Sequence, residues 1–300
     1  MGKGSGSQPA NILNRPAQRL LAVLAHPDDE SFGMGGTLAL YAQRGVEVHL
    51  ICATRGEAGM MDAEHLQGYT SIADKREAEL RCAARILGLS EVHFLDYRDS
   101  GMPGSADNQH PQALVAAPLE EVSLKIAHLI RRIKPQVVLT FDPIGGYRHP
   151  DHIAIHQATL LALEYAGDAA LETDGLAPYR PEKLYYHTIS RRFLRMAVRL
   201  MPLFGKDPTR WGKNGDIDLK SLAIEDFPTH AVVDFTPVRE LKAEASACHS
   251  SQGGAGLAQG IWGLIMRVAG SRETFMRAYP APVNGSVERD LFSGIQNKQM

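Results

Sequence analysis

Two short segments rich in histidine and carboxylate have the composition of a catalytic metal site. They are HPDDE at residues 26–30 and HPDH at residues 149–152, about 120 residues further along the chain. Two histidines and one carboxylate can hold Zn²⁺ while leaving a coordination position for water. Zinc lowers the pKa of that water to about 7 and so provides a nucleophile at neutral pH. The residue types therefore indicate metal-assisted hydrolysis.

Hydrolysis of an amide also needs a base for the water proton and a group that stabilises the oxyanion or protonates the leaving amine. Asp28, beside Asp29, is available as the base. His149 is available for the oxyanion and the amine, and Asp151 is close enough in sequence to orient it. The alternative for the first segment is a solvated turn, because adjacent aspartates are common in turns. Two histidines and an aspartate within four residues make that alternative weaker for the second segment.

The elements that precede these segments are strand-like. Residues 20–25 (LLAVLA) and 137–141 (VVLTF) are continuous apolar runs, which is typical of strands buried on both faces. In a doubly wound sheet of order 3-2-1-4, the first and fourth strands are neighbours, and ligands bind beyond their carboxyl ends. Both segments are therefore expected to face one crevice.

Strand and helix patterns alternate along the rest of the chain. This order predicts an α/β, Rossmann-like fold with a mostly parallel sheet, helices on both faces and the site at the carboxyl ends of the strands. Residues 1–18 are predicted to be a flexible tail and 19–300 a single domain. Within it, residues 190–230 are either a lid or substrate rim, or a plain surface excursion. Further strands are predicted over 46–53, 92–95, 183–189 and 232–235, and helices over 37–44, 72–87, 119–133, 153–165, 238–249 and 261–279.

Composition narrows the class of protein. The formal net charge is −2, so nucleic-acid binding is not expected. No apolar run reaches the ~18 residues of a membrane span, and the polar N-terminus is unlike a signal peptide. Cys52, Cys82 and Cys248 are odd in number and widely spaced, which favours buried thiols in a reducing compartment. A cytoplasmic protein with a small-molecule substrate is expected, and a homo-oligomer is left open.

These segments, together with further motifs, resemble the PIG-L-like (LmbE-like) family of zinc-dependent N-acetylglucosamine deacetylases. AHPDDE at 25–30, with Gly-Gly-Thr at 35–37, is similar to the family's first motif, and HPDH to its second. The resemblance covers roughly residues 20–255, and residues 97–104 are most similar to the mycothiol-related branch. Other similarities are TRGE at 54–57, RxxE…LG at 76–88, DYRDSGM at 96–102 and KxxAxxxHxSQ at 242–252.

The resemblance implies a role for each motif residue. It implies a Zn²⁺ ion, with Fe²⁺ as an alternative in cells, held by His26, Asp29 and His152. The other implied residues act around this ion: Asp28 as general base, His149 as oxyanion stabiliser or acid held by Asp151, Tyr147 at the reacting group, Arg76 and Asp99 at the sugar hydroxyls, and Glu57 as an orienting carboxylate.

Several of these residues have a simpler explanation. Arg76 could form a surface ion pair with Glu79 on one helix face. Asp99 and Glu57 could be ordinary turn carboxylates. Lys242 and His249 are seven residues apart, so they share one face of a helix that points either inward or to solvent. Their functional roles are therefore weaker expectations than the metal ligands.

The function predicted from the sequence is removal of the acetyl group from a small molecule that contains N-acetylglucosamine. The alternatives are an amidase that cleaves a larger N-acyl group from a glucosamine conjugate, and a non-catalytic sugar-binding relative. A non-haem iron oxygenase also uses two histidines and a carboxylate, but such enzymes usually present them on a β-barrel. A dinucleotide-binding dehydrogenase is disfavoured because the glycines at 33–36 do not fit GxGxxG.

Overall fold

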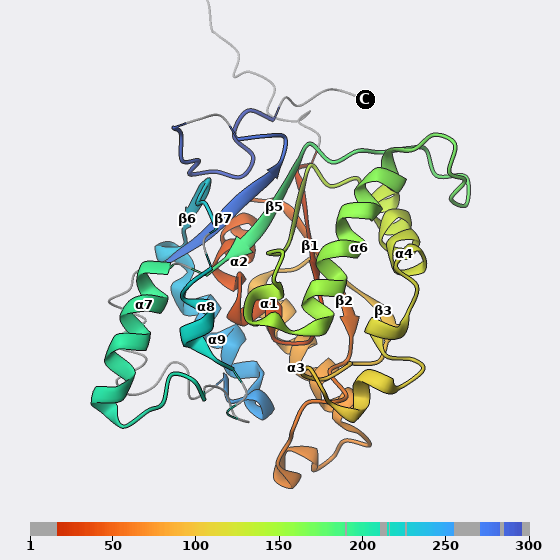
Figure 1. Cartoon of the computed structure of the whole chain (residues 1–300). Coiled ribbons are helices and arrows are strands. Elements are labelled where there is room, and N and C mark those ends of the chain that lie inside the picture. The colour runs from red at the N-terminus through yellow and green to blue at the C-terminus, as the bar shows by residue number, and fades with distance from the viewer. Residues whose placement is uncertain are drawn as a thin grey trace, which may run out of the picture.

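The computed structural model describes residues 17–189, 191–210, 215, 217–225, 227–254, 271–282 and 285–295. Within these ranges, seven strands form one sheet in the order β3-β2-β1-β4-β5-β7-β6 (Figure 1). The first five strands are mutually parallel, and β7 is antiparallel to both of its neighbours. The strands are β1 (Arg19–Leu24), β2 (Glu47–Thr54), β3 (Glu91–Tyr97), β4 (Val137–Phe141), β5 (Lys183–Thr188), β6 (Ala231–Asp234) and β7 (Arg272–Tyr279).

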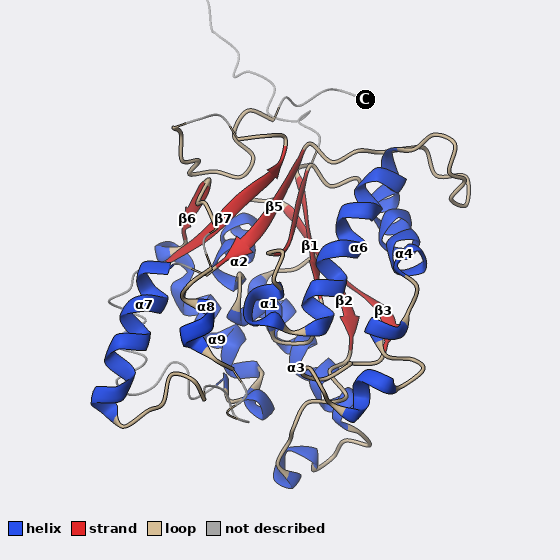
Figure 2. Ribbon diagram, viewed as in Figure 1, coloured by secondary structure: helices blue, strands red, loops and turns tan. Residues whose placement is uncertain are grey.

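Helices cover both faces of this sheet (Figure 2). In one layer α4 packs against α6, and in the other α2, α3 and α9 pack together. The predicted α/β fold with a mostly parallel sheet is therefore confirmed. The helices are α1 (Asp29–Phe32), α2 (Gly35–Gln43), α3 (Ile72–Leu87), α4 (Leu119–Ile133), α5 (Gly145–Arg148), α6 (Pro150–Gly167), α7 (Arg191–Leu200), α8 (Leu219–Leu222) and α9 (Arg239–Cys248).

The central strands β1 and β4 are apolar on both faces because helices cover both sides of them. Every residue of β4 is buried, as is every residue of β1 after Arg19. Leu20 pairs with Val137 and Ala22 with Leu139, so the carboxyl ends of the two strands lie side by side. This register places the two histidine segments next to each other, as the strand order predicted.

Local sequence signals set the ends of two helices near the site. Ser71 caps α3 by accepting the N–H of Asp74, and Gly88 ends it in the left-handed region at φ 74°. The helix predicted over 72–87 is thus confirmed. The helix predicted over 153–165 begins earlier, at Pro150, because proline is favoured in a first turn and His149 serves as the N-cap.

The C-terminal part of the helix predicted over 261–279 is wrong, because residues 272–279 form strand β7. Glu273, Phe275 and Arg277 are buried and alternate with more exposed residues, which is the period of a strand. The apolar run before this segment has a helical pattern, and the prediction extended that pattern too far. Residues 261–270 lie outside the described residues.

Two of the three cysteines are bonded to each other. Cys82 on α3 and Cys248 on α9 form a disulfide whose Cα atoms are 6.0 Å apart, and Cys52 is a buried thiol. The prediction of three thiols is therefore wrong for Cys82 and Cys248, and the reducing compartment inferred from it loses its basis. Because the two cysteines are 166 residues apart, sequence spacing gave no sign that α3 and α9 pack together.

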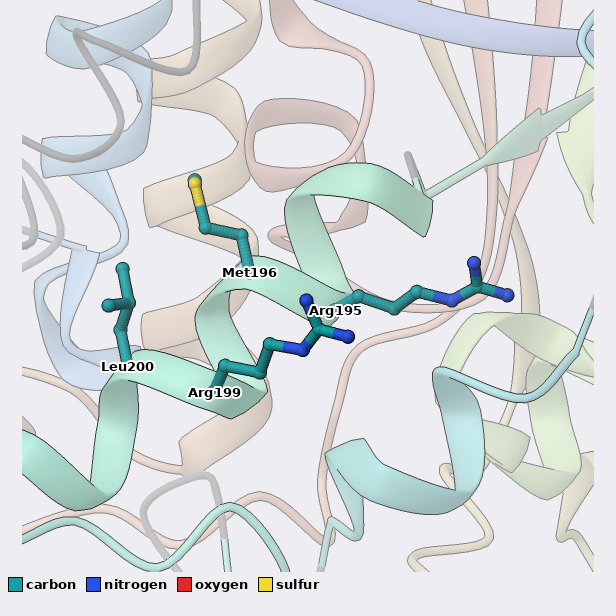
Figure 3. Close-up of a pocket in the computed structure, with 4 residues that line it drawn as sticks. All are labelled: Arg195, Met196, Arg199 and Leu200. Atoms are coloured by element: carbon teal, nitrogen blue, oxygen red, sulfur yellow. The ribbon is translucent and has the colours of Figure 1, made fainter.

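The excursion at 190–230 contains two helices, α7 and α8. Leu194 and Leu222 form a small apolar cluster with Tyr147, one of the predicted site residues. This packing places the excursion beside the predicted site, and its role as a rim stays a prediction. A separate pocket of about 380 Å³ lies on α7, lined by the four residues labelled in Figure 3: Arg195, Met196, Arg199 and Leu200. No helix within the described residues is long and apolar enough to cross a membrane.

We predict that Gly36→Ala destabilises the fold. A Cβ at Gly36 would lie 2.2–2.5 Å from ring atoms of Phe235, so the helix α2 and that ring would have to separate. Such overpacking costs about 1–3 kcal/mol in the free energy of unfolding, measured by urea denaturation. The control is Gly167→Ala, whose Cβ would make ordinary contacts with Arg180 at 3.6 Å. Equal stabilities of the two variants would show that the ring moves without cost.

Candidate active site

The carboxyl ends of β1 and β4 bring the HPDDE and HPDH segments into one buried cluster. His26 Nδ1 lies 3.2 Å from His152 Nε2. The Asp29 carboxylate lies 3.6 Å from His26 Nδ1 and 3.3 Å from His152 Nε2. The two imidazoles are 5% and 2% exposed. The donor atoms of the three predicted ligands therefore face one another away from solvent.

The separations of His152 Nε2 from His26 Nδ1 and from Asp29 Oδ1 are close to those of a tetrahedral metal site, while His26 Nδ1 lies nearest the other Asp29 oxygen, Oδ2. With bonds of about 2.0–2.1 Å, two ligand atoms of a tetrahedral zinc ion are about 3.4 Å apart. The other ring nitrogens are held by oxygen atoms: His26 Nε2 lies 3.0 Å from Asp151 Oδ2, and His152 Nδ1 lies 3.2 Å from the Gly145 carbonyl. Contacts of this kind fix the tautomer and orientation of metal-binding imidazoles. The residues present can therefore hold a metal ion.

His149 lies beside the same cluster. Its ring centroid is 4.5 Å from that of His26 and 5.0 Å from that of His152, so it could also reach a shared ion. Its Nδ1 accepts the N–H of Asp151, at 3.2 Å. Burial, together with the two neighbouring histidines, lowers the pKa of His149 to about 2. The ring is therefore neutral at physiological pH, and its Nε2 carries the proton as a hydrogen-bond donor.

The Asp151 carboxylate does not orient His149 as the sequence suggested. Its Oδ2 instead contacts His26 Nε2 and accepts the N–H of Ser100, at 2.9 Å. The backbone amide of Asp151 is what contacts His149. The reason is the capping of α6, in which the His149 ring accepts the backbone N–H of Asp151. The fully buried Asp151 carboxylate is therefore free to bind the imidazole of His26, just after β1.

Tyr147 also joins the cluster, from the short helix α5. Its ring centroid is 5.0 Å from that of His152 and 5.8 Å from that of His149. Positive φ angles at Gly145 and Gly146 let the chain turn tightly enough to place this ring over the histidines. Burial raises the pKa of Tyr147 well above its ordinary value, so the phenol remains protonated and able to donate a hydrogen bond.

Asp28 occupies a strained position next to the predicted ligand Asp29. Its φ of 123° is unusual for a residue with a side chain, and such strain persists where surrounding contacts enforce it. Burial raises the pKa of the Asp28 carboxyl to about 6, with Arg76 opposing the rise and Asp29 adding to it. A carboxyl with this pKa can accept and release a proton near neutral pH, as a general base must.

Arg76 lies behind Asp28 and is almost fully buried. It donates to the carbonyls of Pro27 and Gly56, at 2.7 and 2.9 Å, and to Asp28 Oδ2 at 3.0 Å. The alternative of a surface ion pair with Glu79 is therefore wrong. Three of its five N–H donors are thus used within the protein, one of them on Asp28, and Nε has no partner among the described residues. Its contact with a substrate sugar stays a prediction.

Asp99 and Glu57 are brought to the site together. Glu57 Oε2 accepts the backbone N–H of Asp99 at 3.0 Å. Asp99 Oδ1 accepts the N–H of Gly101 at 2.8 Å and lies 3.4 Å from His26 Nε2. Asp99 therefore makes the turn contact that the sequence left open as an alternative, but at 4% exposure it does so as a buried carboxylate. Its contact with a substrate sugar stays a prediction.

Sequence reasoning missed the role of Glu30, the last residue of the HPDDE segment. Glu30 and His249 are fully buried, and their Oε1 and Nε2 atoms are 2.7 Å apart. Glu30 Oε2 also accepts the N–H of Asp28, at 3.0 Å. The KxxAxxxHxSQ motif was the available signal, since it supplies this histidine. Of the two orientations left open for His249, the inward one is correct.

The same late motif binds two more buried carboxylates. Lys242 Nζ lies 2.5 Å from Glu273, whose carboxylate accepts the N–H groups of Gly36 and Thr37 at the start of α2. Ser251 donates to Glu79 of α3 through its N–H and its hydroxyl. Lys242 therefore also points inward. The motif fastens α9 and the turn after it to both helices behind the HPDDE segment.

A mostly parallel α/β sheet with a histidine–carboxylate cluster at its switch point is an architecture that suits a metal-dependent hydrolase. Similarity to known proteins identifies the family. The family described as "PIG-L: GlcNAc-PI de-N-acetylase" matches residues 21–163. The 1D-myo-inositol 2-acetamido-2-deoxy-alpha-D-glucopyranoside deacetylase of Kineococcus radiotolerans is 39% identical over 80% of this chain and 70% of the relative. The chain belongs to the PIG-L family. This confirms the predicted family, and the relative's name agrees with the mycothiol-related branch.

Two solved structures share the fold at lower identity. One is the N,N'-diacetylchitobiose deacetylase of Pyrococcus horikoshii, with a TM-score of 0.59, 22% identity and coverage of 89% of this chain and 87% of that one. The other is GalB, the 4-carboxy-2-hydroxymuconate hydratase of Pseudomonas putida KT2440, with a TM-score of 0.59, 20% identity and coverage of 89% and 98%. Because one fold carries both activities, the function has to be argued from the site.

We predict that Arg76→Met raises the pKa of Asp28. The Arg76 cation favours the ionised form of that carboxyl, so its removal makes ionisation harder. A base must be ionised to act, so activity is lost as pH falls through its pKa. The acidic limb of the kcat/KM profile should therefore move to higher pH in the variant, measured against wild type with the same metal. An unmoved limb, with activity reduced equally at every pH, would contradict the assignment.

We also predict that His249→Ala destabilises the protein by about 3–5 kcal/mol, because Glu30 loses its partner in a fully buried pair. Urea denaturation measures this loss. The matched control is His128→Ala, since His128 is partly exposed and pairs with the exposed Asp174, so its loss should cost about 0–1 kcal/mol. A cost for His249→Ala as small as that of the control would mean that the buried pair adds nothing to the fold.

Proposed function

We propose that this protein is a Zn²⁺-dependent deacetylase that removes the acetyl group from N-acetylglucosamine linked to inositol. The observation that carries the proposal is the meeting of His26, the Asp29 carboxylate and His152 in one buried cluster, with contacts of 3.2 to 3.6 Å, next to the Asp28 carboxyl, whose pKa is raised. The substrate class follows from the relative, which is named as a deacetylase of that compound.

In this proposal His26, Asp29 and His152 hold the ion. Bound zinc acts as a Lewis acid that acidifies a water ligand and polarises the amide carbonyl. Asp151 holds the His26 ring through Nε2 and so keeps Nδ1 directed at the ion. The two-histidine, one-carboxylate set also suits Fe²⁺, and zinc is proposed because the remaining residues fit hydrolysis.

Asp28 is proposed as the base that takes the proton of the attacking water and later gives it to the leaving amine. Its carboxyl is fixed by Arg76, and its backbone N–H is fixed by Glu30, so it cannot rotate away from the cluster without breaking buried contacts. The Nε2–H of neutral His149 and the hydroxyl of Tyr147 are the donors available to the developing oxyanion.

We predict that Asp28→Asn keeps the metal and loses turnover, whereas His152→Ala loses the metal. Removing a general base lowers kcat by about 10²–10⁴-fold. The measurements are metal content by mass spectrometry and release of free amine from the inositol-linked substrate. The matched control is Asp207→Asn, because Asp207 lies on the surface and bonds to Thr209. Wild-type turnover in Asp28→Asn would remove it from the mechanism.

The substrate is tested on a panel of N-acetylglucosaminides and mycothiol-type conjugates with the zinc-loaded protein. Release from the inositol-linked compound, absent in Asp28→Asn, supports the deacetylase. Release from bulky conjugates alone would instead make the protein an amidase that uses the same site. Bound zinc without release from any compound would overturn the proposed substrate class and favour a sugar-binding relative.

A further inference from the structure

A second cluster of possible metal ligands lies at the opposite end of the sheet from the candidate active site. His49 is near the start of β2, and Glu91 and His93 are at the start of β3, which runs beside it (Figure 1). His49 and Glu91 are register partners, and His93 is two residues further along. Because side chains alternate between faces, all three lie on one face of the sheet. One ligand atom from each lies within 4.8 Å of the others.

Two nitrogen atoms in this cluster are buried without a hydrogen-bond partner. They are Nδ1 of His49 and Nε2 of His93, and the His93 side chain is more than nine-tenths buried. Glu91 Oε2 is the nearest carboxylate oxygen, 3.5 Å from His93 Nε2. A buried polar atom without a partner costs about 1–3 kcal/mol, so such atoms are rare in folded proteins. Within the described part of the chain, each ring thus has a buried nitrogen without a partner, and one ligand atom of each ring lies within 4.8 Å of the other and of Glu91.

The charge state of the rings suits a cation. Burial lowers the pKa of His49 and of His93, so both imidazoles are neutral at physiological pH and have a lone pair to offer. The imidazole planes are 8° from parallel, with centroids 6.0 Å apart. Two acidic and two basic side chains lie around the rings, so their charges cancel: Glu47 pairs with Arg19, and Glu91 lies near Arg132.

We propose that His49, Glu91 and His93 form a second metal site, for a divalent transition ion such as Zn²⁺, separate from the candidate active site. Two imidazoles and one carboxylate are a donor set that suits Zn²⁺, Cu²⁺ and Ni²⁺. Glu91 is the exposed member, so the ion enters from its side. The bound ion would join β2 to the edge strand β3, whose far ends lead to Glu57 and Asp99.

Arg132 of α4 is the competitor for this site. Its Nη2 lies 3.1 Å from His93 Nδ1, and donation to that atom leaves the proton of a neutral ring on Nε2. Metal binding through Nε2 therefore requires the proton to move to Nδ1 and Arg132 to swing away. The Arg132 side chain is about half exposed, so it can do so. Removing its charge should strengthen metal binding.

The test is a zinc titration of metal-free, full-length protein against a chromophoric chelator. The expected result is one more equivalent of zinc in wild type than in His93→Gln or Glu91→Gln. Arg132→Gln should bind that equivalent at least ten-fold more tightly. The control His128→Gln removes a histidine of α4 that pairs with Asp174, and it should match wild type. Glu91→Gln alters an exposed side chain, so it gives an answer even where His93→Gln fails to fold.

The same titration in His26→Ala separates this site from the proposed catalytic metal. The additional equivalent should survive there, and it should disappear from the double variant His26→Ala/Glu91→Gln. Identical zinc stoichiometry in wild type and Glu91→Gln, with no tightening in Arg132→Gln, would overturn the second site. That outcome would leave the pairing of His93 with Arg132 as the whole function of the cluster.

Discussion

The parallel pairing of β1 with β4 is the constraint on which the site depends. One histidine–proline–aspartate segment directly follows β1, the other follows β4 after the short helix α5, and the two segments are far apart along the chain. The register of these two strands, together with the turn through α5 into the first turn of α6, brings Nδ1 of His26 to 3.2 Å from Nε2 of His152. Because both strands are buried on both faces, a one-residue shift in their register would turn every core side chain to the opposite face and disrupt its packing. The stability of the sheet therefore also fixes the geometry of the proposed metal ligands.

A second set of contacts, between buried carboxylates and the late motif around α9, holds the HPDDE segment in place. Glu30, Glu79 and Glu273 are buried carboxylates on three separate segments, and each is bound by the late motif around α9. A buried carboxylate without a partner is costly, so these pairs specify one position for α9. Glu30 in turn holds the backbone of Asp28. A motif more than 200 residues away thereby helps to position the proposed base.

Much of this arrangement could be predicted from the sequence. The apolar runs, the capping residues of α3 and the clustering of histidine with aspartate are local signals. These signals gave strands β1 to β6, helices α2, α3, α4, α6 and α9, and most of the residues that meet at the candidate site. The errors concern long-range contacts. Asp151 binds His26 instead of His149, Arg76 binds Asp28 and two carbonyls, and Cys82 bonds to Cys248. None of these partners is visible from spacing along the chain.

The failure at β7 has a different cause. Buried and more exposed residues alternate within residues 272–279 with the period of a strand. The strongly apolar stretch before them has the period of a helix, and the two patterns overlap where they meet. The strand is stable because β5 and β6 flank it, and neither neighbour is adjacent in sequence. Whether a short alternating segment forms a strand therefore depends on the neighbouring strands that the fold places beside it.

The disulfide between α3 and α9 has a consequence for the integrity of the chain. It closes a covalent ring that contains β3, β4, β5, the excursion carrying α7 and α8, and β6. A peptide bond cut anywhere between Cys82 and Cys248 would leave two fragments still joined to each other. Each fragment would carry strands that the other must pair with, including β5 in one and β7 in the other for a cut within the excursion. A nicked molecule would thus remain a single covalent body, and its two halves could not diffuse apart until that sulfur bond was reduced.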